Sequence, residues 1–281
     1  MAYSTDINLV LGPIVIGTVL NGFIYGICFA QFLTYWNNCF KDTYIIRYLV
    51  GWTFLLDTFH SGALFYMLWA YVVTNFGNPI FLTAVLWPFS ATPIVTTLTS
   101  FPIQIFLSWR IRQLSQSKKV FYCLVFMAAA QGSVGLACSI SAFKVPDLAL
   151  YHILVPYVDA WQVLAVATDA SISILLWYHL SQSRTGQKRS DCVIQRVIRT
   201  SVETAAFGAF FCIMDLITFT VLLRTNFHVI FAFPMGRIYT NALLMNLNSR
   251  PSLRAEFEGP FIPDIALDQL SSRLCNGVLS D

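Results

Sequence analysis

The sequence predicts an all-α, polytopic membrane protein folded as a bundle of seven transmembrane helices. Three observations lead to this prediction. The 281 residues are 57% hydrophobic and only 11% charged, whereas a soluble domain carries about 25% charged residues. Seven apolar stretches reach the length of about 20 residues that a helix needs to cross the hydrocarbon core. Lys and Arg are concentrated in alternate loops between these stretches.

The predicted spans use most of the chain. They cover roughly 8–35, 45–73, 80–109, 120–141, 152–180, 196–223 and 226–247. Backbone groups in lipid must be satisfied within their own segment, and these stretches are far too long for barrel strands, so each is predicted to be a helix. The bundle would fill residues 1–250, and residues 251–281 lack any sustained period and are predicted to form a mobile cytosolic tail.

The basic residues orient the predicted bundle. One side, formed by the first, third and fifth loops and the tail, holds Lys41, Arg47, Arg110, Arg112, Lys118, Lys119, Arg184, Lys188, Arg189, Arg196, Arg199, Arg250, Arg254 and Arg273. The other side has only Lys144 and Arg224. Because cytoplasmic loops carry the excess of basic residues, the N-terminus is expected outside and the C-terminus in the cytosol. We expect the plasma membrane rather than an internal membrane.

The largest predicted cytosolic loop runs over residues 181–195 and carries Arg184, Lys188 and Arg189. These residues could contact anionic lipid or a cytosolic signalling partner. The positive-inside rule explains the same charges without any partner. Both interpretations stay open.

Four ionisable residues fall near the middle of predicted spans, namely Asp57, His60, Asp169 and Arg237. Such residues cost about 2.5–3.5 kcal/mol each at a helix centre and mark function by default. Asp57 and His60 are three residues apart and therefore share one helix face. Arg237 cannot readily lose its charge. We expect it to pair with Asp57 or Asp169, with His60 as a titratable neighbour.

The third predicted span is unusually polar. At helical spacing it carries Thr92, Thr96, Thr99 and Gln104, and its backbone ladder is interrupted by Pro88, Pro93 and Pro102. Free carbonyls are tolerated in a membrane where they face protein or water. We therefore expect a small ligand or ion cavity, bounded by the second, third, fifth and seventh spans. Its predicted lining is Asp57, His60, Thr96, Gln104, Asp169 and Arg237. A purely structural role, in which the buried charges fix the register of three helices, explains them equally well.

The sequence argues against an enzyme, and it predicts no cofactor, no metal and no nucleic-acid partner. A catalytic zinc site needs three protein ligands, but His60 is the only histidine near mid-membrane. The HExxH and GxSxG motifs are absent. A retinal Schiff base needs a lysine in the last span, where this chain has Arg237.

Several motifs are distinctive. They include Leu11-Gly12-Pro13, Leu56-Asp57-Thr58-Phe59-His60, Thr74-Asn75-Phe76-Gly77-Asn78-Pro79, Trp109-Arg110-Ile111 and Ser183-Arg184-Thr185-Gly186, and the strongest block runs from Gly236 to Arg250. Through these motifs nearly the whole chain resembles a large fungal family of seven-helix membrane proteins, best represented in mushroom-forming basidiomycetes. The family is defined by a C-terminal domain of unknown function, expected here over about 160–250. Its members often carry Lys in place of Arg237, so the resemblance implies a permanent positive charge at this position.

Three functions remain as alternatives. A receptor-like sensor would bind a small-molecule ligand in the polar cavity and pass the signal to its cytosolic loops. A secondary transporter or channel for a small solute or proton would use Asp57, His60 and Asp169 as proton or substrate groups. A structural membrane scaffold would need the charges only for helix register. The receptor comparison rests on shape alone, because Trp109-Arg110-Ile111-Arg112 replaces the acidic-Arg-aromatic triplet of G-protein-coupled receptors.

Overall fold

The computed structural model describes residues 7–38, 42–78, 81, 84–145, 153–182, 206–222 and 225–249. Within these ranges the chain folds into helices joined by turns and short irregular segments, so the all-helical prediction is confirmed there. Four helices are long and apolar enough to cross a membrane. They are α1 (Ile7–Asn37), α3 (Trp87–Ser115), α4 (Lys118–Phe143) and α5 (Val155–Gln182).

The other predicted spans fold into helices that differ from these four. α2 (Tyr44–Trp69) has 26 residues and continues into the π-helical turn η1 (Ala70–Thr74). Asp57 and His60 in its middle lower its hydropathy. The described part of the sixth predicted span is a shorter apolar helix, Ala206–Val221. The last span is divided into α7 (Val229–Ala232) and α8 (Met235–Asn248).

The third helix differs most from its predicted bounds. It begins at Trp87 rather than near residue 80, because Pro88 is favoured in the first turn of a helix, where its missing N–H costs nothing. It ends at Ser115 rather than near residue 109. The next residue, Gln116, ends the helix with a left-handed φ of 54°, and its N–H bonds to Arg112 O at 2.9 Å. Arg110 therefore lies inside a helix rather than in a loop.

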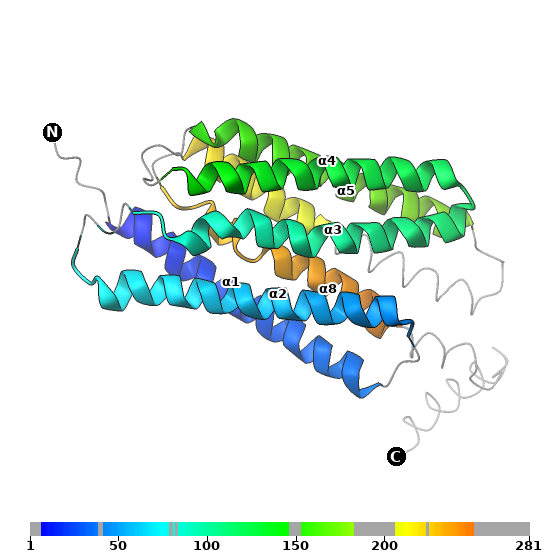
Figure 1. The fold of residues 1–281 in the computed structure, drawn as a ribbon, viewed down its shortest axis with the longest axis horizontal. Coiled ribbons are helices and arrows are strands. Elements are labelled where there is room, and N and C mark those ends of the chain that lie inside the picture. Colours follow the sequence, from blue (N-terminus) through cyan, green and yellow to red (C-terminus); the bar gives the residue numbers. More distant parts are fainter. Residues whose placement is uncertain are drawn as a thin grey trace, which may run out of the picture.

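The central helix of the bundle is α3 (Figure 1). It packs against α2, α4, α5 and α8, and its most extensive contact is with α4. α1 packs against α2, α7 and α8. The N-terminal pair α1 and α2 is thereby joined to the C-terminal segment, while α4 and α5 cover another side of α3.

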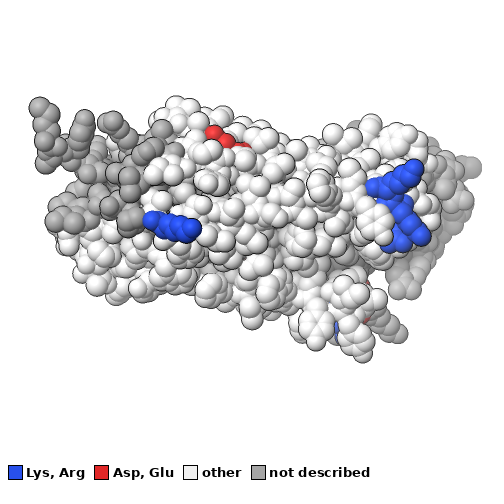
Figure 2. All heavy atoms as spheres, turned by 45° about the horizontal axis from the view of Figure 1, so that its top comes forward, with Lys and Arg blue, Asp and Glu red and all other residues white. Residues whose placement is uncertain are grey.

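Polar and apolar side chains are distributed as in a protein that faces lipid. Large apolar side chains are more than half exposed on several helices, among them Phe23, Leu55, Phe126, Ile174 and Val221. In Figure 2 the Lys and Arg side chains of the visible face lie towards the two ends of the molecule, and the surface between them is almost free of charge. Exposed apolar surface of this extent marks an interaction with a membrane. Together with the four apolar helices, it indicates a membrane protein.

Two prolines inside helices expose carbonyls that other elements bind. Proline has no N–H and leaves the carbonyl four residues earlier without its helical donor. Pro13 frees Leu9 O, which accepts the backbone N–H of Asn226 at 3.3 Å. Pro102 frees Leu98 O, which accepts Trp52 Nε1–H at 3.0 Å. The interrupted ladders therefore join α1 to the start of the last segment, and α2 to α3.

Small residues let α4 lie close to its neighbours. A Cβ at Gly135 would clash with Thr97 Oγ1 of α3 and would lie 2.7 Å from Trp161 Nε1 of α5. On the same side of α4, Ser139 Oγ donates to Ser90 O of α3. Close approach of this kind is the typical use of small residues in membrane helices.

Candidate functional site

The backbone around Pro234 places Arg237 in the interior of the bundle. Pro234 separates α7 from α8, and Arg237 N–H bonds to Pro234 O at 2.9 Å instead of continuing the α-helical ladder. Phe233 O therefore stays free to accept from the Arg237 side chain, at 3.4 Å from Nη1. Arg237 is fully buried. Its guanidinium must find all its partners within the protein.

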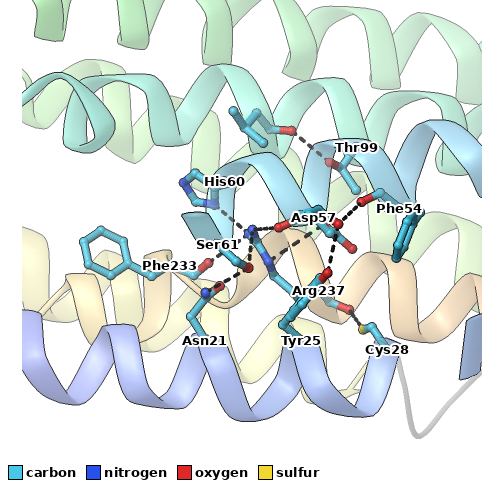
Figure 3. A network of polar contacts seen from close by, with 12 residues as sticks. Asn21, Tyr25, Cys28, Phe54, Asp57, His60, Ser61, Thr99, Phe233 and Arg237 are labelled. Carbon is cyan, nitrogen blue, oxygen red and sulfur yellow. Dashed lines mark hydrogen bonds and ion pairs between the residues drawn. The ribbon is translucent and has the colours of Figure 1, made fainter. Parts of the chain in front are cut away.

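Its other partners come from α2, and with them it forms the Arg237 cluster, which we define as Asp57, His60, Ser61 and Arg237 (Figure 3). Arg237 Nε lies 3.8 Å from Asp57 Oδ1, and both side chains are 0% exposed. Arg237 Nη2 donates to Asp57 O at 3.0 Å and to Ser61 Oγ at 3.4 Å. Arg237 Nη1 lies 2.6 Å from His60 Nδ1. The structure thus pairs Arg237 with Asp57.

The hydrogen bonds of His60 have a fixed direction. A guanidinium only donates, so His60 Nδ1 accepts and the ring proton is on Nε2. His60 Nε2 then donates to Thr92 Oγ1 at 3.0 Å, and the Thr92 hydroxyl donates to Pro88 O at 2.9 Å. This chain of donors connects α8 to α3 through α2.

The carboxylate of Asp57 is incompletely satisfied. Neither of its oxygens accepts a hydrogen bond from the described residues, and Thr96 Oγ1 also has no partner among them. Both groups border the backbone of Gly236, where an added Cβ would lie 4.0 Å from Asp57 Oδ1 and from Thr96 Oγ1. An ion pair at 3.8 Å offsets only part of the cost of burying a carboxylate. The Arg237 cluster therefore retains unused capacity to accept protons or cations.

The remaining candidates form a second group, the Gln104 cluster, which consists of Gln104, Gln131, Asp169 and Tyr239. Gln104 Nε2 lies 2.9 Å from both Gln131 Oε1 and Asp169 Oδ1. Tyr239 Oη donates to Asp169 Oδ2 at 2.7 Å. Asp169 is thus satisfied by neutral donors and does not pair with Arg237. In the part of the chain that is described, no hydrogen bond joins the two clusters, and the prediction that the six candidate residues line one cavity stays a prediction.

A cavity of about 60 Å³, which we call the Asp215 cavity, lies beside the Arg237 cluster. Its walls come from α3, α4, α5, the helix Ala206–Val221 and the segment around α7. Asp215 is 2% exposed, and its Oδ2 accepts from Gln162 Nε2. Its Oδ1 has no hydrogen-bond partner among the described residues. Thr92 and Phe233, which contact the Arg237 cluster, also line this cavity.

Residues 165–252 match a family of unknown function, DUF6534. This DUF6534 domain fits the C-terminal domain that the motifs predict, and it includes Asp169, Asp215 and Arg237. No curated protein and no solved structure matches the chain. The DUF6534 domain therefore supplies part of each polar group, while α2, α3, α4 and the first turns of α5 supply the partners from outside it.

Sequence reasoning missed three important residues of these groups. Gln131 and Tyr239 are uncharged, and only their position at helical spacing or within the strongest motif could have indicated them. Asp215 lies nearer the end of its predicted span than the other candidates, so its depth gives no signal for a site near mid-membrane. The candidate partner residues Arg184, Lys188 and Arg189 and the tail over 251–281 fall outside the described residues. Within the described ranges, no three His, Cys, Asp or Glu side chains are grouped to hold a metal ion.

Proposed function

We propose that this protein is a receptor-like sensor of a small ligand, built from seven membrane-spanning helices. In this proposal the N-terminus faces the outside and the tail faces the cytosol at the plasma membrane, as the distribution of Lys and Arg favours. The Arg237 cluster sets the resting arrangement of α2 and α8. The basic loop with Arg184, Lys188 and Arg189 contacts a cytosolic partner. No catalytic step is part of this function.

One observation supports the proposal above the others. Thr92 and Phe233 each belong to the wall of the Asp215 cavity and to the hydrogen bonds of the Arg237 cluster. Thr92 accepts from His60, and Phe233 O accepts from Arg237. A ligand in the cavity therefore touches residues that hold the buried guanidinium in place.

A ligand changes a conformational equilibrium only by binding its two states unequally. Here the difference would arise at Thr92 and Phe233, because moving either changes a hydrogen bond to His60 or Arg237. Arg237 in turn is joined to α1, where Cys28 Sγ donates to Arg237 O at 3.3 Å. α8 leads directly to the residues of the tail. In this proposal the Arg237 cluster connects the cavity to the cytosolic surface.

The sensor proposal is tested by proximity labelling from the tail in cells. Wild type and Arg237→Gln are compared at matched surface expression, and Asp159→Asn is the control because Asp159 lies outside both the cavity and the Arg237 cluster. We expect signalling proteins to be enriched around wild type and the control, and to be lost around Arg237→Gln. Identical labelling for all three proteins would overturn the sensor proposal.

A secondary transporter or channel is the second candidate. It is favoured by the two carboxylate oxygens of Asp57, which accept no hydrogen bond from the described residues and could receive a proton or cation. Reconstituted liposomes would then show an intrinsic flux that Asp57→Asn abolishes. If variants of Asp57 and Arg237 change only protein stability, with neither flux nor altered labelling, the charges act as a structural scaffold.

A further inference from the structure

We propose that the Asp215 cavity binds the ammonium group of a small organic amine. This inference deepens the sensor function, on which it rests, by naming the chemical class of the ligand. Binding itself can be measured without any signalling partner. The two proposals can therefore fail separately.

The first argument is the unpaired carboxylate. Asp215 is buried, Gln162 occupies its Oδ2, and its Oδ1 has no hydrogen-bond partner among the described residues. In the same part of the chain, no Lys, Arg or His nitrogen forms an ion pair with it, whereas Asp57 has Arg237 as its partner. A buried carboxylate without a counter-charge is strongly unfavourable. A protonated amine would supply both the charge and an N–H donor.

The second argument is the aromatic wall of the cavity. Asp215 shares it with Phe89, Trp161, Phe219 and Phe233. The ring centroids of Phe89 and Phe233 lie 6.0 Å apart at an interplanar angle of 85°. Aromatic rings attract alkylammonium groups through their negative faces, and the attraction grows when the cation is desolvated. Carboxylate and rings together are complementary to a cation that also has an apolar part.

The same wall disfavours other ligand classes. Among the described residues of the lining, His228 is the only basic side chain, and its ring packs at steep angles against Phe89 and Phe219, with centroids 5.6 and 4.8 Å away. An anion would therefore meet Asp215 without a neighbouring Lys or Arg. A sugar or polyol needs many hydrogen-bonding groups, whereas most of this wall is apolar. An amine is the class that matches both the charge and the rings.

The volume of the cavity limits the size of the ligand. The cavity of about 60 Å³ is well above the roughly 10–15 Å³ that one water molecule needs, and well below the roughly 150 Å³ of an engineered apolar cavity that binds benzene. Methylammonium or ethylammonium fits this space, and a larger amine would place only its ammonium end there. Because Thr92 and Phe233 form part of the wall, the bound cation would lie beside the Arg237 cluster.

The proposal is tested with the full chain in lipid nanodiscs, using ethylammonium chloride as the probe and calorimetric titration as the measurement. Ethanol serves as a neutral ligand of similar shape, and sodium chloride keeps the ionic strength constant. We expect saturable binding of ethylammonium but not of ethanol. Asp215→Asn should weaken binding by at least about tenfold, because the counter-charge is lost while the Gln162 contact can persist. Asp159→Asn, whose carboxylate accepts from Thr220, should bind like wild type.

A second variant tests the proposal independently, in case Asp215→Asn fails to fold. Phe219→Leu keeps the charge and most of the apolar volume but removes one ring, so affinity should fall by about three- to tenfold. Absence of saturable binding by folded wild type, or equal weakening in Asp215→Asn and Asp159→Asn, would overturn the amine proposal. If ethylammonium binds through Asp215 but tail labelling is insensitive to Arg237, the ligand class is supported and the sensor function is overturned. If tail labelling depends on Arg237 but no amine binds, the sensor function is supported and the amine proposal is overturned.

Discussion

The guanidinium of Arg237 joins several buried polar groups from different elements. It meets Asp57, His60, Ser61 and Phe233 at the same time, and its planar fork of donors suits such divided contacts better than an ammonium group would. The sequence predicted a carboxylate partner because ionisable residues in the spans are few. It did not distinguish Asp57 from Asp169, since the rotation of each helix about its axis depends on packing. Gln104 and Tyr239, which satisfy Asp169, decide the pairing.

At this scale we predict that Asp57→Asn lowers the free energy of unfolding by about 3–5 kcal/mol, because Arg237 is left buried without a counter-charge. The double variant Asp57→Asn/Arg237→Met removes both charges and should be more stable than the single variant. Unfolding of the purified protein in mixed micelles, titrated with a denaturing detergent, measures both. Asp159→Asn is the matched control, with an expected effect near zero. A double variant less stable than the single one would contradict the prediction.

At the scale of elements, the sequence located the helices better than it located their ends. Hydropathy averages over a whole span, whereas helix ends depend on single residues such as Pro88, Gln116 and Pro234. The prediction that prolines in the third span would expose carbonyls agrees with the structure at Pro102. The sequence could not show which group binds the freed Leu98 O, because Trp52 lies on another helix, 46 residues away in the chain. Such pairings depend on tertiary packing.

The bond from Trp52 Nε1 to Leu98 O gives a prediction for the α2–α3 contact. In wild type, Trp52→Phe keeps an aromatic ring but loses the donor, and should cost about 1 kcal/mol of stability. In a Pro102→Ala background the restored N–H at position 102 can bond to Leu98 O, so the same change should cost clearly less. A double-mutant cycle of unfolding free energies measures this coupling. Strict additivity would show that the two donors do not share one carbonyl.

At the scale of the whole molecule, the sequence predicted the fold class, and the described residues agree with an all-helical membrane protein. Hydropathy alone identifies fewer spans than the sequence predicts. Four helices satisfy length and hydropathy. α2 carries Asp57 and His60 in its middle, and the last segment is divided at Pro234. The residues that obscure these spans are those of the Arg237 cluster and its neighbours. The same buried groups that suggest a function therefore weaken the hydropathy signal.

α4 offers a direct test of the proposed topology. Its 26 residues extend over about 39 Å at about 1.5 Å per residue, which exceeds a hydrocarbon core of about 30 Å. Lys118 begins the helix and Lys144 directly follows it, so the two lysines lie at opposite ends. In a variant without accessible native cysteines, an impermeant maleimide should label Lys144→Cys on intact cells and Lys118→Cys only after permeabilisation. Labelling of both positions from the same side would mean that α4 does not span the membrane, and it would contradict the seven-span arrangement.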